Sequence, residues 1–140
     1  MSWSNRYVGI PFKEFGRESV GCDCYGLAVL VYLQELGMQL TSYAGDYVSC
    51  EERKDLNALF SDAIEFGPWR KVEGPAQAFD IALFRIGNLA AHCGVVVENG
   101  RMLHVQGEDQ VKVENYRTGT WQPRLIGHYR HEDMRVRADD

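Results

Sequence analysis

The chain has 140 residues, of which 45% are hydrophobic and 25% are charged, a composition typical of one globular domain and not of a disordered chain. The formal net charge of −5 argues against a partner held through phosphate groups, so nucleic acid is not an expected ligand. No stretch reaches the roughly 18 apolar residues of a membrane span, and the first residues lack the layout of a secretory signal, so we expect no membrane partner and synthesis in the cytoplasm.

The first half of the chain predicts a loop and two helices. Residues 1–22 mix aromatic residues with glycine and proline, which is typical of a structured loop. Residues 23–36 have apolar side chains at helical spacing, with Asp23 as a candidate N-cap and Gly37 as a helix end. Residues 49–66 show a second apolar stripe that ends before Gly67 and Pro68, so we expect a second helix there.

The second half predicts strands. Five short segments are rich in β-forming residues and divided by turn residues: 81–86, 92–98, 101–106, 111–116 and 124–130. The sequence therefore predicts an α+β fold with N-terminal helices packed on a mostly antiparallel five-stranded sheet. We expect a single domain over 1–140, with its core at about 9–130 and a solvated tail at 131–140.

Cys24 is the first candidate for chemistry. At the first turn of the predicted helix, unpaired backbone amides and the helix dipole stabilise an anion, which predicts a lowered pKa for its thiol. The alternative is a small buried apolar residue, as most cysteines are. A nucleophilic thiolate also needs an imidazole, and that imidazole needs a polar partner. His92 and His104 are the candidates, because both lie in apolar strands where an imidazole needs a partner.

The cysteines also allow other interpretations. Cys22, Cys24, Cys50 and Cys93 match neither a disulfide framework nor a CxxC zinc pattern, so we expect free thiols. A zinc site built from Cys22, Cys24, His92, Cys93 and His104 is disfavoured, because CxC is not the usual structural spacing and adjacent strand residues point to opposite faces. We therefore predict no metal and no cofactor.

The motifs Asp23-Cys24-Tyr25-Gly26-Leu27, Asp80-Ile81-Ala82-Leu83-Phe84, His92-Cys93-Gly94-Val95 and Leu103-His104-Val105 resemble, in order and spacing, those of NlpC-type cell-wall cysteine peptidases. The resemblance covers about residues 9–130. It implies a papain-like fold and cleavage of the γ-D-glutamyl to diamino acid bond of peptidoglycan stem peptides. It assigns the nucleophile to Cys24, the base to His92 and the third polar residue to His104.

The resemblance also implies substrate-binding roles. Asp23, besides capping the helix, would bind the free amino group of the substrate, and Tyr25 and Phe12 would contribute to the substrate site. Tyr25 stands where the family usually has serine, and Phe12 stands where it usually has tyrosine. The loss of that hydroxyl leaves oxyanion stabilisation to backbone amides, notably that of Cys24.

Cys24-Tyr25-Gly26 and the closing stretch from Trp121 to Arg130 look most like the subgroup encoded among phage tail genes and gene-transfer-agent clusters. This implies a tail-associated lysin, made in the bacterial cytoplasm and assembled into the virion tail with tail-tip proteins. Two alternatives remain: a structural tail-tip protein on an inactive peptidase fold, and an N-acetylmuramoyl-L-alanine amidase.

The remaining polar and aromatic residues receive ordinary roles. Asp80 is expected to cap a turn. His128 and His131 are expected to be solvated, and the tryptophans to form core or groove walls: Trp3, Trp69 and Trp121.

The turn between the two histidine strands decides whether His92 and His104 share a face. A regular two-residue turn at Asn99-Gly100 pairs Val95 with His104 and separates the imidazoles. A three-residue loop, or an equivalent bulge, brings His104 opposite Gly94 and puts both rings on one face, with room for the ring beside the glycine. The proposed dyad therefore requires an irregular hairpin.

Overall fold

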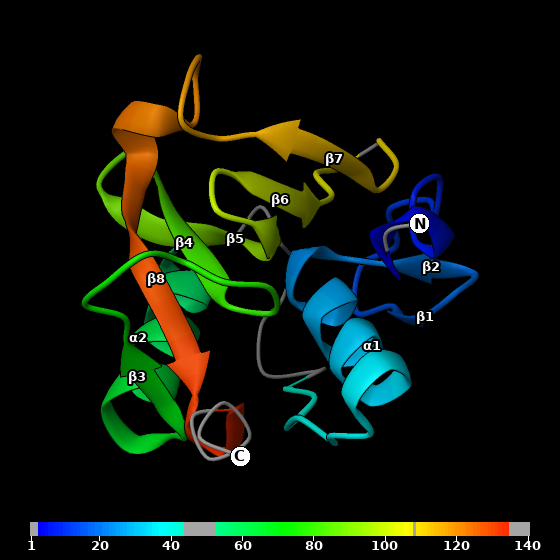
Figure 1. Ribbon diagram of the computed structural model, residues 1–140, viewed down its shortest axis with the longest axis horizontal. Coiled ribbons are helices and arrows are strands. Elements are labelled where there is room, and N and C mark those ends of the chain that lie inside the picture. Colours follow the sequence, from blue (N-terminus) through cyan, green and yellow to red (C-terminus); the bar gives the residue numbers. More distant parts are fainter. Residues whose placement is uncertain (1–2, 44–52, 108, 135–140) are drawn as a thin grey trace.

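The computed structural model describes residues 3–43, 53–107 and 109–134. Its elements are η1 (Trp3–Arg6), β1 (Arg17–Glu18), β2 (Gly21–Cys22), α1 (Cys24–Leu36), α2 (Arg53–Phe66), β3 (Trp69–Lys71), β4 (Ile81–Ile86), β5 (Leu89–Glu98), β6 (Arg101–His104), β7 (Lys112–Asn115), η2 (Gln122–Arg124) and β8 (Leu125–His131). Helices precede most of the sheet, as predicted (Figure 1).

Helix α1 follows its sequence signals closely. The Asp23 side chain accepts a hydrogen bond from the Gly26 amide at 2.7 Å and caps the helix. Gly37 ends it in the left-handed conformation, with φ of 65°. The predicted second helix is confirmed from Arg53 to Phe66, and its expected start at residues 49–52 lies outside the described residues.

The main sheet is antiparallel and has six strands in the order β3-β8-β4-β5-β6-β7. The prediction of five strands was wrong by one, because β3 has only three residues and no visible periodicity. A small hairpin of β1 and β2 also lies within the expected N-terminal loop. The β4 bounds are as predicted, whereas β5 begins earlier, at Leu89.

The core has two clusters, one on each face of the sheet. The larger one joins the sheet to α1 and α2, and Val95 of β5 belongs to it. Val96, the next residue, belongs to the smaller cluster, which Tyr116 and Trp121 cover from the other face.

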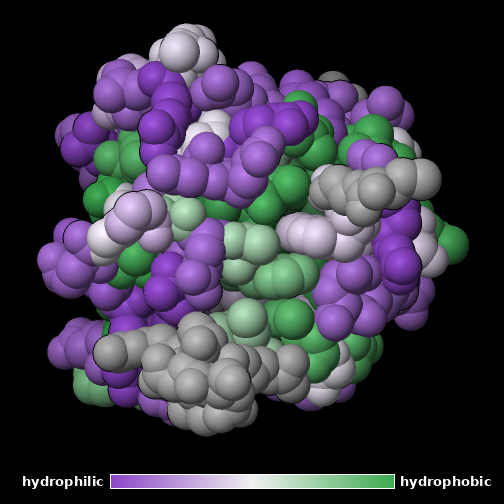
Figure 2. Space-filling view, viewed as in Figure 1, coloured by the Kyte–Doolittle hydropathy of each residue, from purple (hydrophilic) through white to green (hydrophobic). Residues whose placement is uncertain are grey.

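Exposed large apolar residues include Val20 and Phe66, and Figure 2 shows polar residues around the apolar ones on one side of the molecule.

Strand β8 continues one residue further than predicted, to His131. His131 is the last residue of β8, is buried, and packs edge-on against Trp69 at 5.2 Å between ring centroids. The solvated tail predicted from residue 131 was therefore wrong at its start, and residues 135–140 lie outside the described residues. Within the described ranges, none of the helices has the length and apolarity needed to cross a membrane.

Candidate active site

Three side chains from three adjacent strands form a hydrogen-bonded line. His92 of β5 and His104 of β6 are linked by 2.9 Å between Nε2 of the first and Nδ1 of the second. His104 Nε2 is 2.8 Å from Oε1 of Glu114, on edge strand β7. Both imidazoles are buried, and the Glu114 side chain is 37% exposed. The structure thus brings the two predicted histidines together and adds a carboxylate.

An irregular hairpin makes this contact possible. Glu98 pairs with Arg101 across the turn Asn99-Gly100, but the register then shifts, so that Val96 pairs with Met102. The turn itself has two residues, so of the two predicted forms the structure shows the bulge and not the three-residue loop. The extra residue is Val97, whose bulge has the same effect on the register.

The bulge puts both imidazoles on the face of the smaller core cluster. One residue beyond the Val95–Leu103 pair, the register brings His104 opposite Gly94, as the sequence argument required. The space beside Gly94 is filled by Met102, since an added Cβ would lie 2.5 Å from the Met102 sulfur. Gly94 therefore makes room for Met102, and its contribution to the space beside the imidazole remains a prediction.

Trp121 packs against both imidazoles. Its ring stacks on His92 with 4.7 Å between centroids and an interplanar angle of 21°, and it meets His104 edge-on at 5.3 Å. Burial, and then the neighbouring His92, lower the pKa of His104 to about 4, although the bond to Glu114 acts in the opposite direction. His104 is therefore neutral at pH 7.

The start of α1 is held by a buried carboxylate. Besides capping the helix, Asp23 accepts from the Phe15 amide at 3.0 Å and from Nη1 of Arg17 at 2.9 Å. Arg17 also donates to the Ser42 carbonyl. Because the Asp23 side chain is 0% exposed, its observed role is to fix the backbone around Cys24. Its binding of a substrate amine remains a prediction.

Two sets of contacts join the start of α1 to the histidine strands. The Cys93 thiol donates to the Cys24 carbonyl at 3.5 Å, and Cys93 follows His92 directly in β5. The second set runs through Phe12, which forms an isolated β-bridge with Cys22, two residues before Cys24. The Phe12 amide donates to the Asp109 carbonyl at 2.9 Å. Cys24, itself buried, therefore begins a helix that is attached to β5 and to the segment between β6 and β7.

The other predicted substrate residues have internal contacts. Tyr25 is buried, and its hydroxyl donates to the Thr41 carbonyl at 2.8 Å. Phe12 is half-buried and packs against the larger core cluster. Their contacts with substrate remain predictions.

The sequence model of the NlpC/P60 family matches residues 9–130, which include all of these side chains. This chain belongs to the NlpC/P60 family. The "Tail tip assembly protein K" of Escherichia phage N15 is 29% identical over 115 residues, covering 81% of this chain. The chain spans 46% of the length of that relative.

Solved structures share the papain-like fold. The NlpC/p60 domain of the peptidoglycan hydrolase SagA has a TM-score of 0.53 and 22% identity, covering 80% of this chain and 82% of that one. An NlpC/P60 family protein of Bacillus cereus has a TM-score of 0.60 and 17% identity, over 91% of this chain and 37% of its own. The predicted family and fold class are confirmed.

Sequence reasoning missed two residues at the site of this NlpC/P60 domain. Glu114 could have been found by pairing residues 101–104 with residues 112–115 in an antiparallel register. This register places His104 opposite Lys112 and makes Glu114 the diagonal neighbour of the imidazole. Arg17 has no comparable signal, because it reaches Asp23 from a two-residue strand inside an expected loop.

Three of the four cysteines of this NlpC/P60 domain lie in the part of the chain that the structure describes. Cys22, Cys24 and Cys93 are not in disulfides, and Cys50 lies outside the described residues. Among the described residues, no three histidine, cysteine, aspartate or glutamate side chains are grouped so that they could hold a metal ion. Burial, with a smaller effect from Asp23, raises the pKa of Cys22 to about 12.

His128 and His131 were predicted to be solvated, but the structure buries one of them and half-buries the other. His128 is half-buried, and its Nε2 is 2.8 Å from the Tyr116 hydroxyl. Burial lowers the pKa of both His128 and His131. The prediction failed because both residues belong to β8, which lies inside the sheet between β3 and β4.

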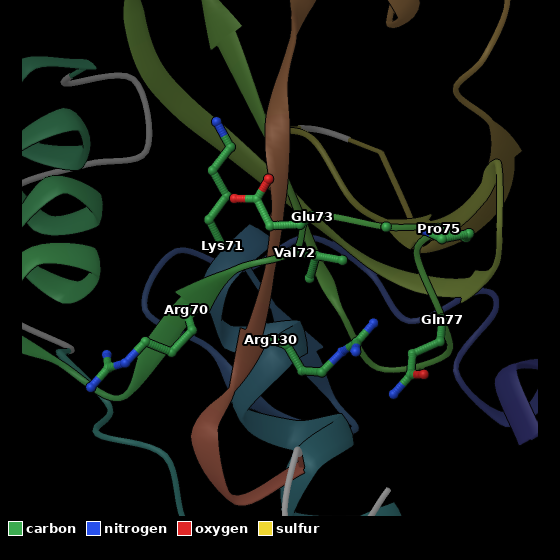
Figure 3. Close-up of a pocket in the computed structure, with 8 residues that line it drawn as sticks. Arg70, Lys71, Val72, Glu73, Pro75, Gln77 and Arg130 are labelled. Atoms are coloured by element: carbon green, nitrogen blue, oxygen red, sulfur yellow. The ribbon is translucent and has the colours of Figure 1, made fainter.

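A hollow of about 460 Å³ lies where β3 and β8 meet the segment before β4 (Figure 3). Arg130 lines it and binds the buried Asp80 through two contacts of 2.7 and 2.9 Å. Asp80 also accepts from the Gln77 amide, which agrees with the expected turn cap. None of the predicted catalytic residues lines this hollow.

Proposed function

We propose that this NlpC/P60 domain is a cysteine peptidase of peptidoglycan, cutting the amide bond between γ-D-glutamate and the diamino acid of stem peptides. The observation that carries the proposal is the buried His92–His104 pair, 2.9 Å apart, on strands attached to the helix that Cys24 begins. An imidazole oriented by a second polar group is what a thiol nucleophile needs.

In the proposed reaction, the Cys24 thiolate attacks the amide carbon and forms a tetrahedral oxyanion. First-turn backbone amides, notably that of Cys24, stabilise the negative charge. The C–N bond then breaks as His92 gives its proton to the leaving amine, which leaves a thioester. Water gives a proton to His92 and attacks the thioester, and breakage of the C–S bond releases the acid and restores the thiolate. This cycle uses no cofactor.

The phage N15 relative supports a place for the domain at a virion tail tip. We infer that the protein meets tail-tip proteins during assembly and opens the cell wall locally during genome delivery. The name of that relative equally supports a second function, assembly of the tail tip without catalysis. An activity test separates the two functions.

The test uses purified protein and Cys24→Ala with defined peptidoglycan fragments, and products are identified by mass. We expect the wild type alone to release fragments cut after γ-D-glutamate. Fragments cut between the muramoyl group and L-alanine would identify an amidase instead. No product from the wild type, or equal product from Cys24→Ala, would contradict the proposed mechanism.

A further inference from the structure

We propose that Glu114 is a positioning residue that, through His104, holds His92 in the tautomer whose Nδ1 is free to act as the base. The inference rests on the proposed function and adds a fourth member to the Cys24, His92 and His104 set. It is carried by the geometry of the line across β5, β6 and β7.

The contact geometry follows from the sheet register. Met102 pairs with Glu114, and His104 pairs with Lys112, so Glu114 is the diagonal neighbour of His104 on the same face. Diagonal neighbours are within reach of long side chains, and here Oε1 lies 2.8 Å from Nε2. Because β7 is the edge strand, the carboxylate is the outer end of the line and is partly in contact with water.

The direction of every hydrogen bond in the line is set by the carboxylate. An ionised carboxylate only accepts, so the Nε2–H of His104 donates to Glu114. The Nδ1 of neutral His104 then has no proton and must accept, so the Nε2–H of His92 donates to it. Neutral His92 is therefore left with an unprotonated Nδ1 on the opposite side of its ring.

The hydrogen-bond directions above require His104 to be neutral, and its surroundings favour that form. His92 faces it from β5, and both Lys112 and Glu114 face it from β7, with Asp109 in the preceding segment. Burial and the His92 imidazole keep its pKa near 4, despite the nearby carboxylate. At neutral pH, Glu114 thus orients an uncharged ring.

Trp121 limits the alternative of ring rotation. Its indole lies parallel to His92 and perpendicular to His104, so both imidazoles are confined between packed neighbours. His92 also packs against Phe84 at 6.2 Å between centroids. With the rings held in place, the remaining freedom is which nitrogen carries the proton, and Glu114 determines it.

The test compares Glu114→Ala and the isosteric Glu114→Gln with Glu98→Ala as a matched control. Glu98 is an exposed glutamate at the end of β5, beside the turn, where it pairs with Arg101. We expect Glu114→Ala to lower kcat about ten-fold with KM unchanged, because positioning acts on the proton-transfer step. Glu114→Gln should lose less, since its amide oxygen can still accept from His104, and Glu98→Ala should match the wild type.

Nitrogen-15 NMR of the imidazoles gives a readout that a merely structural role would not change. In the Cys24→Ala background, where no thiolate draws a second proton onto His92, we expect one His92 tautomer, with the proton on Nε2, and a mixture of tautomers once Glu114→Ala is added. Wild-type kcat and a single unchanged tautomer in both Glu114 variants would overturn the inference while leaving the proposed function intact. If the wild type cleaves no fragment, the proposed function fails and the tautomer measurement alone decides the role of Glu114.

Discussion

Two buried aspartate–arginine pairs lie in different parts of the domain and are built in nearly the same way. Asp23 binds Arg17 at 2.9 Å and accepts from the Gly26 amide, and its side chain is 0% exposed. Asp80 binds Arg130 at 2.7 Å, and its side chain is 1% exposed. Each carboxylate also fixes a local turn of backbone, one at a helix start and the other before a strand.

The pairs differ in what they hold in place. Asp23 fixes the first turn of α1, which begins with Cys24 and is attached to the strand of His92. Asp80 binds Arg130, which lines the hollow at β3 and β8, and none of the predicted catalytic residues lines that hollow. A buried ion pair therefore marks a fixed backbone, whereas a neighbouring nucleophile and imidazole distinguish a site from a scaffold.

The largest expected difference between the two regions is in turnover. Cys24→Ala and His92→Ala should each reduce the cleavage of peptidoglycan fragments by at least about a thousand-fold, because nucleophile and base act as one unit. Arg70→Ala, which changes the wall of the hollow, should leave turnover at the wild-type level. A large loss of turnover in Arg70→Ala would contradict the assignment of the chemistry to Cys24 and His92.

In stability, by contrast, the two regions should behave alike. Asp23→Ala and Asp80→Ala should each lower the free energy of unfolding by about 3–5 kcal/mol, because each leaves a mostly buried guanidinium without its partner. Urea denaturation followed by circular dichroism measures this. A loss below about 1 kcal/mol at either position would contradict the view that both pairs are needed to hold their turns.

The two regions also differ in how much space surrounds their glycines. A Cβ added at Gly26 would lie 1.8 Å from the Gly16 carbonyl oxygen and 2.7 Å from Arg17 Nη1. Although alanine is favoured over glycine in a helix by about 1 kcal/mol, overpacking costs about 1–3 kcal/mol or more. We expect Gly26→Ala to be destabilised by about 2 kcal/mol, whereas Gly74→Ala at the hollow meets no atom within 4 Å and should stay within about 1 kcal/mol of the wild type.

The last expected difference concerns the dependence of stability on pH. The pKa of His104 falls from 6.5 to about 4 on folding, so the unfolded chain binds more protons between these values. The associated stability is present above pH 6.5 and is lost as the pH falls towards 4, by at most about 3 kcal/mol. Urea denaturation at pH 7 and pH 4.5 should show a smaller acid loss for His104→Asn than for the wild type. Equal losses would contradict the buried, neutral His104.

The start of α1 could be predicted because its signals are local. The cap, the helix and the glycine end all lie within 15 residues of chain, from Asp23 to Gly37, and depend on contacts between neighbours in sequence. The same holds for β4, whose bounds were predicted as observed.

The histidine end could be predicted only in part, because it depends on register. His92 and His104 could be predicted as site residues from their apolar strands. The apolar run Val95 to Val97, however, does not show which residue forms the bulge. Glu114 depends on a second register across β6 and β7, and β3 depends on pairing with a strand far along the chain. Such long-range pairings leave little trace in local composition.

The proposed mechanism depends on Cys24 being a nucleophile that is activated at the start of α1. Alkylation by iodoacetamide at neutral pH, followed by peptide mapping, tests it directly. We predict that Cys24 reacts at least about ten-fold faster than Cys22, whose burial raises its pKa to about 12. The same advantage should hold over Cys50 and Cys93, and it should disappear in His92→Ala. Equal labelling of all four cysteines in the folded protein, or an unchanged rate at Cys24 in His92→Ala, would contradict the account.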